Sequence, residues 1–133
     1  MSSQIPEAFM YLLEQPVLAS LATLMPDGRP QVNPVWCDFD GTYVRVNSVA
    51  GRQKDKNLNE RKFATLLLVD PGNPYRWLEI RGRVAGITAE GGVAHIDSLA
   101  KKYTGQDTFT GRIESDTRVI YNIIPERVVT HSE

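Results

Sequence analysis

The stretch Leu21-Ala-Thr-Leu-Met-Pro-Asp-Gly-Arg-Pro-Gln-Val-Asn-Pro-Val-Trp36 has the pattern of two strands joined by a tight turn. Residues 17–24 are apolar or small on both alternating faces, which predicts a strand buried on two sides. Within residues 25–30, proline presets φ and Asp-Gly accepts a left-handed bend, so a turn is expected there. A second strand is expected over residues 31–39, and Pro34 within it indicates a sheet edge or a bulge. The stretch therefore predicts an antiparallel hairpin.

Two further strands follow from the next part of the chain. Asp40-Gly41 is a two-residue hairpin signal, and it leads into an alternating strand over residues 42–48. The continuous apolar run over residues 63–69 predicts a central strand of the sheet.

The C-terminal half predicts longer strands with irregularities. Residues 77–87 alternate between apolar and charged side chains, and Gly82 and Gly86 allow the bends that a barrel needs. A last strand or pair of strands is expected over residues 117–130, interrupted at Pro125.

These elements predict a mainly β protein, a small antiparallel β-barrel of about six strands with peripheral helices. The helices are expected over residues 5–14, 52–62 and 93–103. With 133 residues and 14.9 kDa, the chain fits a single domain over residues 1–133.

The composition excludes several classes of protein. Fifteen Lys and Arg residues against sixteen Asp and Glu give a net charge of -1, which disfavours a nucleic-acid-binding protein. Cys37 is the only cysteine, and no cluster of Cys and His suggests a metal site. Residues 1–15 carry no basic side chain, which disfavours a secretory signal, and no apolar run approaches the roughly 20 residues of a membrane span. We expect a cytoplasmic protein without a membrane segment.

No established catalytic motif is present in the sequence. It contains no P-loop and no Gly-x-Gly-x-x-Gly after a strand, and no order of Ser, His and Asp stands out. His95 and His131 are expected to be solvated, and Cys37 to fill space in a strand. Catalytic residues are therefore not identified, and a protein without its own acid, base or nucleophile often relies on a cofactor.

The segment from Arg52 to Lys62 is the first candidate for a binding site. It holds five basic and two acidic residues, a local charge of +3. Because it opens a helix directly after a strand, its free backbone N–H groups favour an anion, and Arg52, Lys54 and Asn57 are expected to converge on a phosphate. The alternative is a solvated helix face.

The second candidate is the segment from Asn73 to Arg83. Tyr75, Arg76 and Trp77 at the start of a strand offer a flat surface for a planar ligand and a cation for its acidic part. The alternative is that Trp77 is a core residue and Tyr75 a loop anchor.

Several of these segments together resemble the split β-barrels similar to pyridoxamine 5′-phosphate oxidase. The resemblance is carried by Leu21 to Trp36, Arg52-Gln-Lys-Asp-Lys-Asn-Leu58, Asn73-Pro-Tyr-Arg-Trp77, Glu79-Ile-Arg-Gly-Arg-Val84 and Arg127-Val-Val-Thr130. The chain most resembles the short branch of flavin/deazaflavin oxidoreductases that use coenzyme F420.

This resemblance implies a six-stranded split barrel that forms a homodimer with two cofactor sites at the subunit interface. It places the cofactor phosphate against Arg52, Gln53, Lys54 and Asn57, with Ser48 beside it. It places the ring near Asn33, Pro34 and Val35, with Tyr75, Arg76 and Trp77 contributing across the interface. Trp36 and Trp77 also exceed what one small barrel needs inside, which favours a dimer.

The implied activity is hydride transfer from reduced F420 to an electron-poor double bond in a planar small-molecule substrate. An FMN-dependent oxidoreductase on the same fold is the nearest alternative. A non-catalytic carrier of a flavin, F420 or a haem-like ring, and a small-barrel nucleic-acid-binding protein, are alternatives of other classes.

Overall fold

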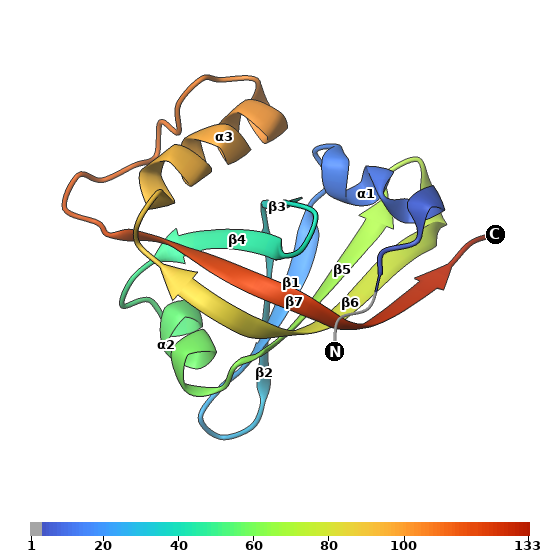
Figure 1. Ribbon diagram of the computed structural model, residues 1–133, viewed down its shortest axis with the longest axis horizontal. Coiled ribbons are helices and arrows are strands. Elements are labelled where there is room, and N and C mark those ends of the chain that lie inside the picture. Colours follow the sequence, from blue (N-terminus) through green and yellow to red (C-terminus); the bar gives the residue numbers. More distant parts are fainter. Residues whose placement is uncertain (1–3) are drawn as a thin grey trace.

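The computed structural model describes residues 4–133 as one curled antiparallel sheet with helices at its rims (Figure 1). The strands are β1 (Ala19–Leu24), β2 (Pro30–Val35), β3 (Cys37–Phe39), β4 (Val44–Val49), β5 (Phe63–Asp70), β6 (Asn73–Thr88) and β7 (Arg118–His131). Their order in the sheet is β2-β1-β5-β6-β7-β4-β3. The predicted mainly β class and split-barrel architecture are confirmed.

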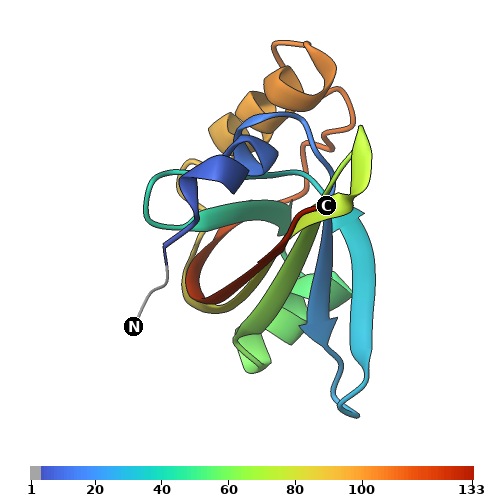
Figure 2. The same cartoon turned by 90° about the vertical axis from the view of Figure 1, so that its right-hand side faces the viewer.

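The two edges of the sheet, β2 and β3, are consecutive in sequence and separated only by Trp36. A single residue cannot span a flat sheet of seven strands, so the sheet must curl until its edges meet. Figure 2 shows this half-barrel from the side. The single strand expected over residues 31–39 is therefore two strands, and the predicted count of six becomes seven.

Strand β6 bends where the glycines predicted it. The register between β6 and β7 shifts between Arg81 and Gly82, and again between Val84 and Gly86. At Gly82 a Cβ atom would lie 2.6 Å from the side chain of Ile123, so only glycine lets the two strands approach this closely. Pro125 lies opposite Gly82 within one continuous strand β7, which is bulged there and not divided.

The helices are short and lie outside the sheet. They are the 3-10 helix η1 (Glu7–Phe9), α1 (Tyr11–Glu14), α2 (Gln53–Glu60) and α3 (Gly92–Thr104). The helix expected over residues 5–14 is thus a 3-10 turn followed by one α-helical turn. Figures 1 and 2 both place α1 and α3 along the same rim of the half-barrel, away from α2.

The core fills the inside of the curled sheet and continues under α1. Its fully buried side chains include Leu12, Leu66, Leu78, Ile80 and Tyr121. Among residues 4–133 there is no helix whose length and hydropathy suit a membrane span.

Candidate functional site

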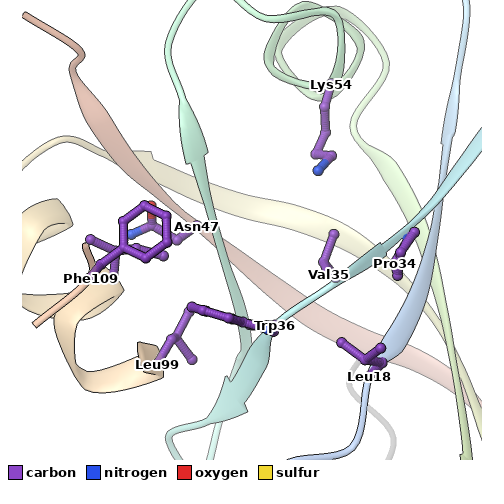
Figure 3. A pocket seen from close by; sticks show the side chains of 9 residues that line it. Leu18, Pro34, Val35, Trp36, Asn47, Lys54, Leu99 and Phe109 are labelled. Carbon is purple, nitrogen blue, oxygen red and sulfur yellow. The ribbon is translucent and has the colours of Figure 1, made fainter. Parts of the chain in front are cut away.

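A cavity opens between α2, α3 and the end of strand β2 (Figure 3). Its volume is about 360 Å³, at the lower end of the range for small-molecule sites. The residues that line it are Leu18, Pro34, Val35, Trp36, Asn47, Lys54, Ile96, Leu99 and Phe109. Lys54 is the only one of them with a formal charge, so the cavity is apolar with one cationic end.

Helix α2 holds Lys54 in place through its own first turn. The chain leaves β4 through Gly51, which has a φ of +94°, a value that glycine adopts at no steric cost. The Asp55 carboxylate accepts a hydrogen bond from the Gly51 N–H at 2.9 Å and one from the Tyr121 hydroxyl at 2.6 Å. Since Tyr121 is fully buried in strand β7, this pair fixes the start of α2 to the barrel.

The ammonium group of Lys54 reaches into the cavity, as Figure 3 shows. Within residues 4–133 no hydrogen bond or ion pair holds it. Burial, together with the nearby positive charge of Arg52, lowers the pKa of Lys54 below its ordinary value. A bound anion would relieve this unfavourable environment.

Arg118, at the start of β7, is a second cation with few partners: its Nη1 donates to Oδ1 of Asn47 at 3.4 Å, and its guanidinium lies 4.9 Å from the centre of the Phe109 ring. Its side chain is only 8% exposed, and its Nε is the one buried side-chain polar atom in the described chain without a hydrogen bond. Burial and Arg52 lower its pKa. Arg52 itself has only a long contact of 4.0 Å to Asp116. Three neighbouring cations with little compensation therefore fit an acidic group, as a cofactor phosphate would supply.

The wall of the cavity formed by α3 carries a buried polar network. Asn47 on β4 contacts His95 at 3.1 Å, and His95 in turn contacts the Asp38 carboxylate at 3.1 Å. Arg45 donates two hydrogen bonds to the same carboxylate, at 2.9 and 2.8 Å. Although burial opposes its ionisation, the hydrogen bonds from His95 and Arg45 hold the pKa of Asp38 below its ordinary value. The prediction that His95 is solvated is wrong: it is 4% exposed, because α3 packs its first turns against β4.

Aromatic rings form the floor of the cavity beside α3. Trp36 stacks on Tyr103 with ring centroids 5.4 Å apart, and Phe109 meets Trp36 edge-on at 5.8 Å. The Asp97 carboxylate accepts a hydrogen bond from the backbone N–H of Phe109 at 2.9 Å, which ties the loop after α3 to the helix. The cavity thus has a flat, apolar floor suited to a planar ligand.

The structure brings some of the residues predicted from the sequence together at this cavity. Pro34, Val35 and Lys54 line it, and Arg52 lies close to Lys54. Asn33 precedes them on β2 but is not part of the lining. Ser48 shares the core-facing side of β4 with Val44 and Val46, opposite the side that carries Asn47.

Asn57 does not join the cluster expected around the phosphate. Its side chain is fully buried, and its amide donates to Thr23, Met25 and Gln31 in and around the β1–β2 hairpin. Its oxygen accepts hydrogen bonds from Gln53 at 2.9 Å and Arg61 at 3.3 Å. Asn57, with Gln53, therefore anchors α2 to the sheet, since it lies on the face of the helix that packs on β1.

Tyr75, Arg76 and Trp77 lie away from the cavity within one chain. They follow the turn at the far end of β5, whose other end joins α2 (Figure 1). Arg76 donates to the Tyr11 hydroxyl at 2.9 Å and to the backbone carbonyl of Ala8 at 2.7 Å. Trp77 is half-buried and stacks on His131, whereas Tyr75 is exposed.

Sequence reasoning missed Asn47 and Phe109, which line the cavity, and also His95 and Arg118, which contact Asn47. Each is an isolated side chain in an ordinary strand, helix or loop, so no spacing links them. The one available signal was that Arg118 directly precedes the apolar residues 119–121 of the last expected strand, where a charge is unusual.

Comparison with known proteins shows the family of this chain. Residues 5–132 match the sequence pattern of the pyridoxamine 5′-phosphate oxidase family. The chain belongs to that family. Among solved structures of similar proteins, an F420 reductase is 34% identical, with a TM-score of 0.85 and an alignment covering 94% of this chain and 98% of that one. The predicted resemblance to split barrels of the pyridoxamine 5′-phosphate oxidase type is confirmed.

More distant solved structures show the fold alone. The conserved hypothetical protein Rv2991 of Mycobacterium tuberculosis is 21% identical, with a TM-score of 0.74 over 98% of this chain and 86% of its own. HupZ of Group A Streptococcus is also 21% identical, with a TM-score of 0.66 over 96% of this chain and 94% of its own. No protein with a curated description matches the chain significantly.

Proposed function

We propose that this chain is an oxidoreductase that binds coenzyme F420 and uses it to reduce an electron-poor double bond in a planar small molecule. Membership of the pyridoxamine 5′-phosphate oxidase family and 34% identity to an F420 reductase support this choice. The observation that carries the proposal is the position of Lys54, a half-buried cation without a partner at one end of an apolar cavity.

The residues of this chain would divide the work of holding the cofactor. Lys54 and Arg52, with Arg118 behind them, would bind its phosphate by charge. Pro34 and Val35, which both line the cavity from β2, would flank the ring system of the cofactor. When bound in its reduced form, F420 supplies a hydride, and the apolar lining keeps competing water away from the ring.

We also propose a homodimer, in which a second copy completes the site. The outer face of β2, β1 and β5 is apolar or small in two successive rows across the strands, first Pro34, Ser20 and Leu67, then Val32, Ala22 and Thr65, and it continues with the pair Pro30 and Leu24 and with Phe63 on β5. Val32 is 60% exposed and Phe63 is 58% exposed. Because Pro34 belongs both to this face and to the cavity, a second copy seated here would lie beside the cavity, to which the family resemblance implies that the partner subunit's Tyr75, Arg76 and Trp77 contribute.

The direct experiment is a titration of the purified protein with F420, and separately with FMN. A charged hydrogen bond to phosphate contributes about 1.5–3 kcal/mol, so Lys54→Ala should weaken F420 binding about ten- to a hundredfold. Lys56→Ala is the matched control, because Lys56 lies on the same helix but is exposed and outside the cavity. It should change the affinity less than twofold.

Equal affinity of F420 for wild type and Lys54→Ala would contradict the anchor. Tight FMN binding with a yellow preparation, and no F420 binding, would make the protein an FMN enzyme on the same fold. Binding of reduced F420 without its oxidation by any planar acceptor would indicate a carrier.

A further inference from the structure

Two fixed partners set the orientation of the Asn47 side-chain amide at the wall of the cavity. Its nitrogen lies 2.8 Å from the backbone carbonyl of Gly92, which can only accept a hydrogen bond. Its oxygen lies 3.4 Å from Nη1 of Arg118, which can only donate. Nδ2 therefore points to α3, and Oδ1 points to Arg118.

This orientation also fixes the tautomer of His95. The second N–H of Asn47 points to Nδ1 of His95 at 3.1 Å, so Nδ1 must accept. The proton of the neutral ring then sits on Nε2, where it is donated to Asp38 at 3.1 Å. Asp38 is held in turn by the two hydrogen bonds from Arg45. His95 is thus a positioning residue that consumes one of the two donors of Asn47.

Asn47 is left able to accept a hydrogen bond but unable to donate one. Both of its N–H groups are used inside the protein, by Gly92 and His95. Its oxygen has two lone pairs and only one long contact, the one to Arg118. Among the described residues that line the cavity, Asn47 is the only one whose side-chain oxygen or nitrogen can accept a hydrogen bond, so a ligand there meets one side-chain acceptor.

The surroundings of Asn47 favour a flat apolar molecule. Phe109, Trp36 and Leu99 form this end of the cavity, and Figure 3 shows Lys54 on the opposite side from Trp36 and Leu99. The cationic end would take the acidic tail of a cofactor, which leaves the aromatic end for a second ligand.

We propose that the aromatic end of the cavity is the subsite of the substrate, and that it selects flat, apolar molecules with an N–H or O–H group at one edge, which donates to Oδ1 of Asn47. The geometry that carries this assignment is the acceptor-only state of Asn47, imposed by His95 and Gly92. That the bound molecule is a substrate rests on the proposed function; that it binds here with this preference does not.

A pair of probes that differ in one hydrogen-bond donor tests the subsite without any cofactor. Quinolin-2(1H)-one is flat, carries a conjugated double bond and has an edge N–H; its 1-methyl analogue lacks that N–H. By calorimetry or fluorescence, the wild-type protein should bind the N–H compound about three- to tenfold more tightly than the methylated one. In Asn47→Leu, this preference should disappear. Asn122→Leu is the matched control, because Asn122 lies on the same side of the adjacent strand β7 but outside the cavity, and should keep the preference.

His95→Phe separates positioning from simple structural support. If His95 keeps Asn47 acceptor-only, His95→Phe should free one N–H of Asn47 to donate to the carbonyl that both probes carry, so the methylated probe should bind more tightly and the preference should fall to less than twofold. A purely structural role would weaken both probes equally. Should His95→Phe fail to fold, Asn47→Leu still decides the question, since it tests the acceptor itself.

Equal binding of both probes to the wild type, no binding of either, or an unchanged preference in Asn47→Leu would each overturn the subsite. Failure of F420 to bind would instead remove the proposed function and leave the probe preference standing.

Discussion

Two regions of this protein combine cations with aromatic rings, and they differ in whether the cations have partners. At the turn between β5 and β6, Arg76 lies 4.0 Å above the ring of Phe9 and donates to the Tyr11 hydroxyl and to a backbone carbonyl. Tyr11 in turn donates to Asp70. At the cavity, Lys54 and the Nε of Arg118 have no such partners among residues 4–133.

The pKa shifts of the charged groups differ between the two regions in the same way. At the turn, the hydrogen bond from Tyr11 lowers the pKa of Asp70, as expected where opposite charges and donors meet. At the cavity, burial and like charge lower the pKa values of Lys54 and Arg118. Cationic and aromatic residues therefore hold the N-terminal segment in place at the β5–β6 turn, whereas at the cavity the cations keep unused hydrogen-bonding groups. Unused hydrogen-bonding capacity, not residue type, distinguishes the candidate site.

The largest effect is expected at Asn57. The sequence predicted this residue at the phosphate, whereas in the structure it anchors α2 to the sheet. Asn57→Ala should lower the free energy of unfolding by about 3 kcal/mol, because several buried partners lose their hydrogen bonds. Urea denaturation measures this. Asn59→Ala, at an exposed position on the same helix, should cost under about 1 kcal/mol. A stable Asn57→Ala variant with lost F420 affinity would restore the original assignment.

A substitution of Arg118 tests the role of the cations at the cavity. Arg118→Met should weaken F420 binding about tenfold, because one of three cations near the proposed phosphate is removed. The free energy of unfolding should stay the same or rise by about 1 kcal/mol, since a buried guanidinium with an unsatisfied Nε and only a long hydrogen bond to Asn47 is replaced by an apolar chain. Titration and urea denaturation of the same preparation give both numbers. A large loss of stability would mean that Arg118 has a structural role.

A substitution of Arg76 tests the role of the cation at the turn between β5 and β6. Arg76→Ala should lower the free energy of unfolding by about 1 kcal/mol, through loss of its contacts to Phe9, Tyr11 and Ala8. F420 affinity should change less than twofold, because the guanidinium is already occupied. A strong loss of affinity with unchanged stability would instead support a contribution across the subunit interface.

The smallest effect at neutral pH concerns Cys37, which lies among well-satisfied groups beside α3. Burial raises the pKa of the Cys37 thiol to about 11, so a thiol reagent should not label the folded protein at pH 8. Because the folded pKa exceeds the unfolded one near 8.5, stability is fully present below that pH and falls by roughly 1 kcal/mol per unit as the pH rises toward 11. Cys37→Ala should lack this part of the slope. Rapid labelling at pH 8 would contradict the assignment.

Much of the fold could be predicted because local chemistry decides it. Pro34 belongs to an edge strand, Gly41 has the left-handed φ of +101° expected of a hairpin, and Gly82 and Gly86 lie at register shifts. The division at Trp36 could not be predicted, because it reflects how the two sheet edges meet and not any local preference.

The candidate site could be predicted only in part, for a related reason. Lys54 belongs to a dense basic segment with a visible charge excess, which the sequence displays directly. Whether its neighbour Asn57 faces the same way depends on which side of α2 packs on β1, and the helix places the two side chains on different faces. His95 looked solvated because its partners, Asp38 and Asn47, lie about fifty residues away in the chain.

The sequence by itself determined the β class of this protein, the hairpins and bends of its sheet, and a cationic helix start, because these depend on residues close together in the chain. Only the tertiary structure decided which cations have partners and which way Asn47 and Asn57 face. Those outcomes depend on hydrogen bonds between distant strands and helices, which exist only once the sheet has curled and α3 has packed against β4.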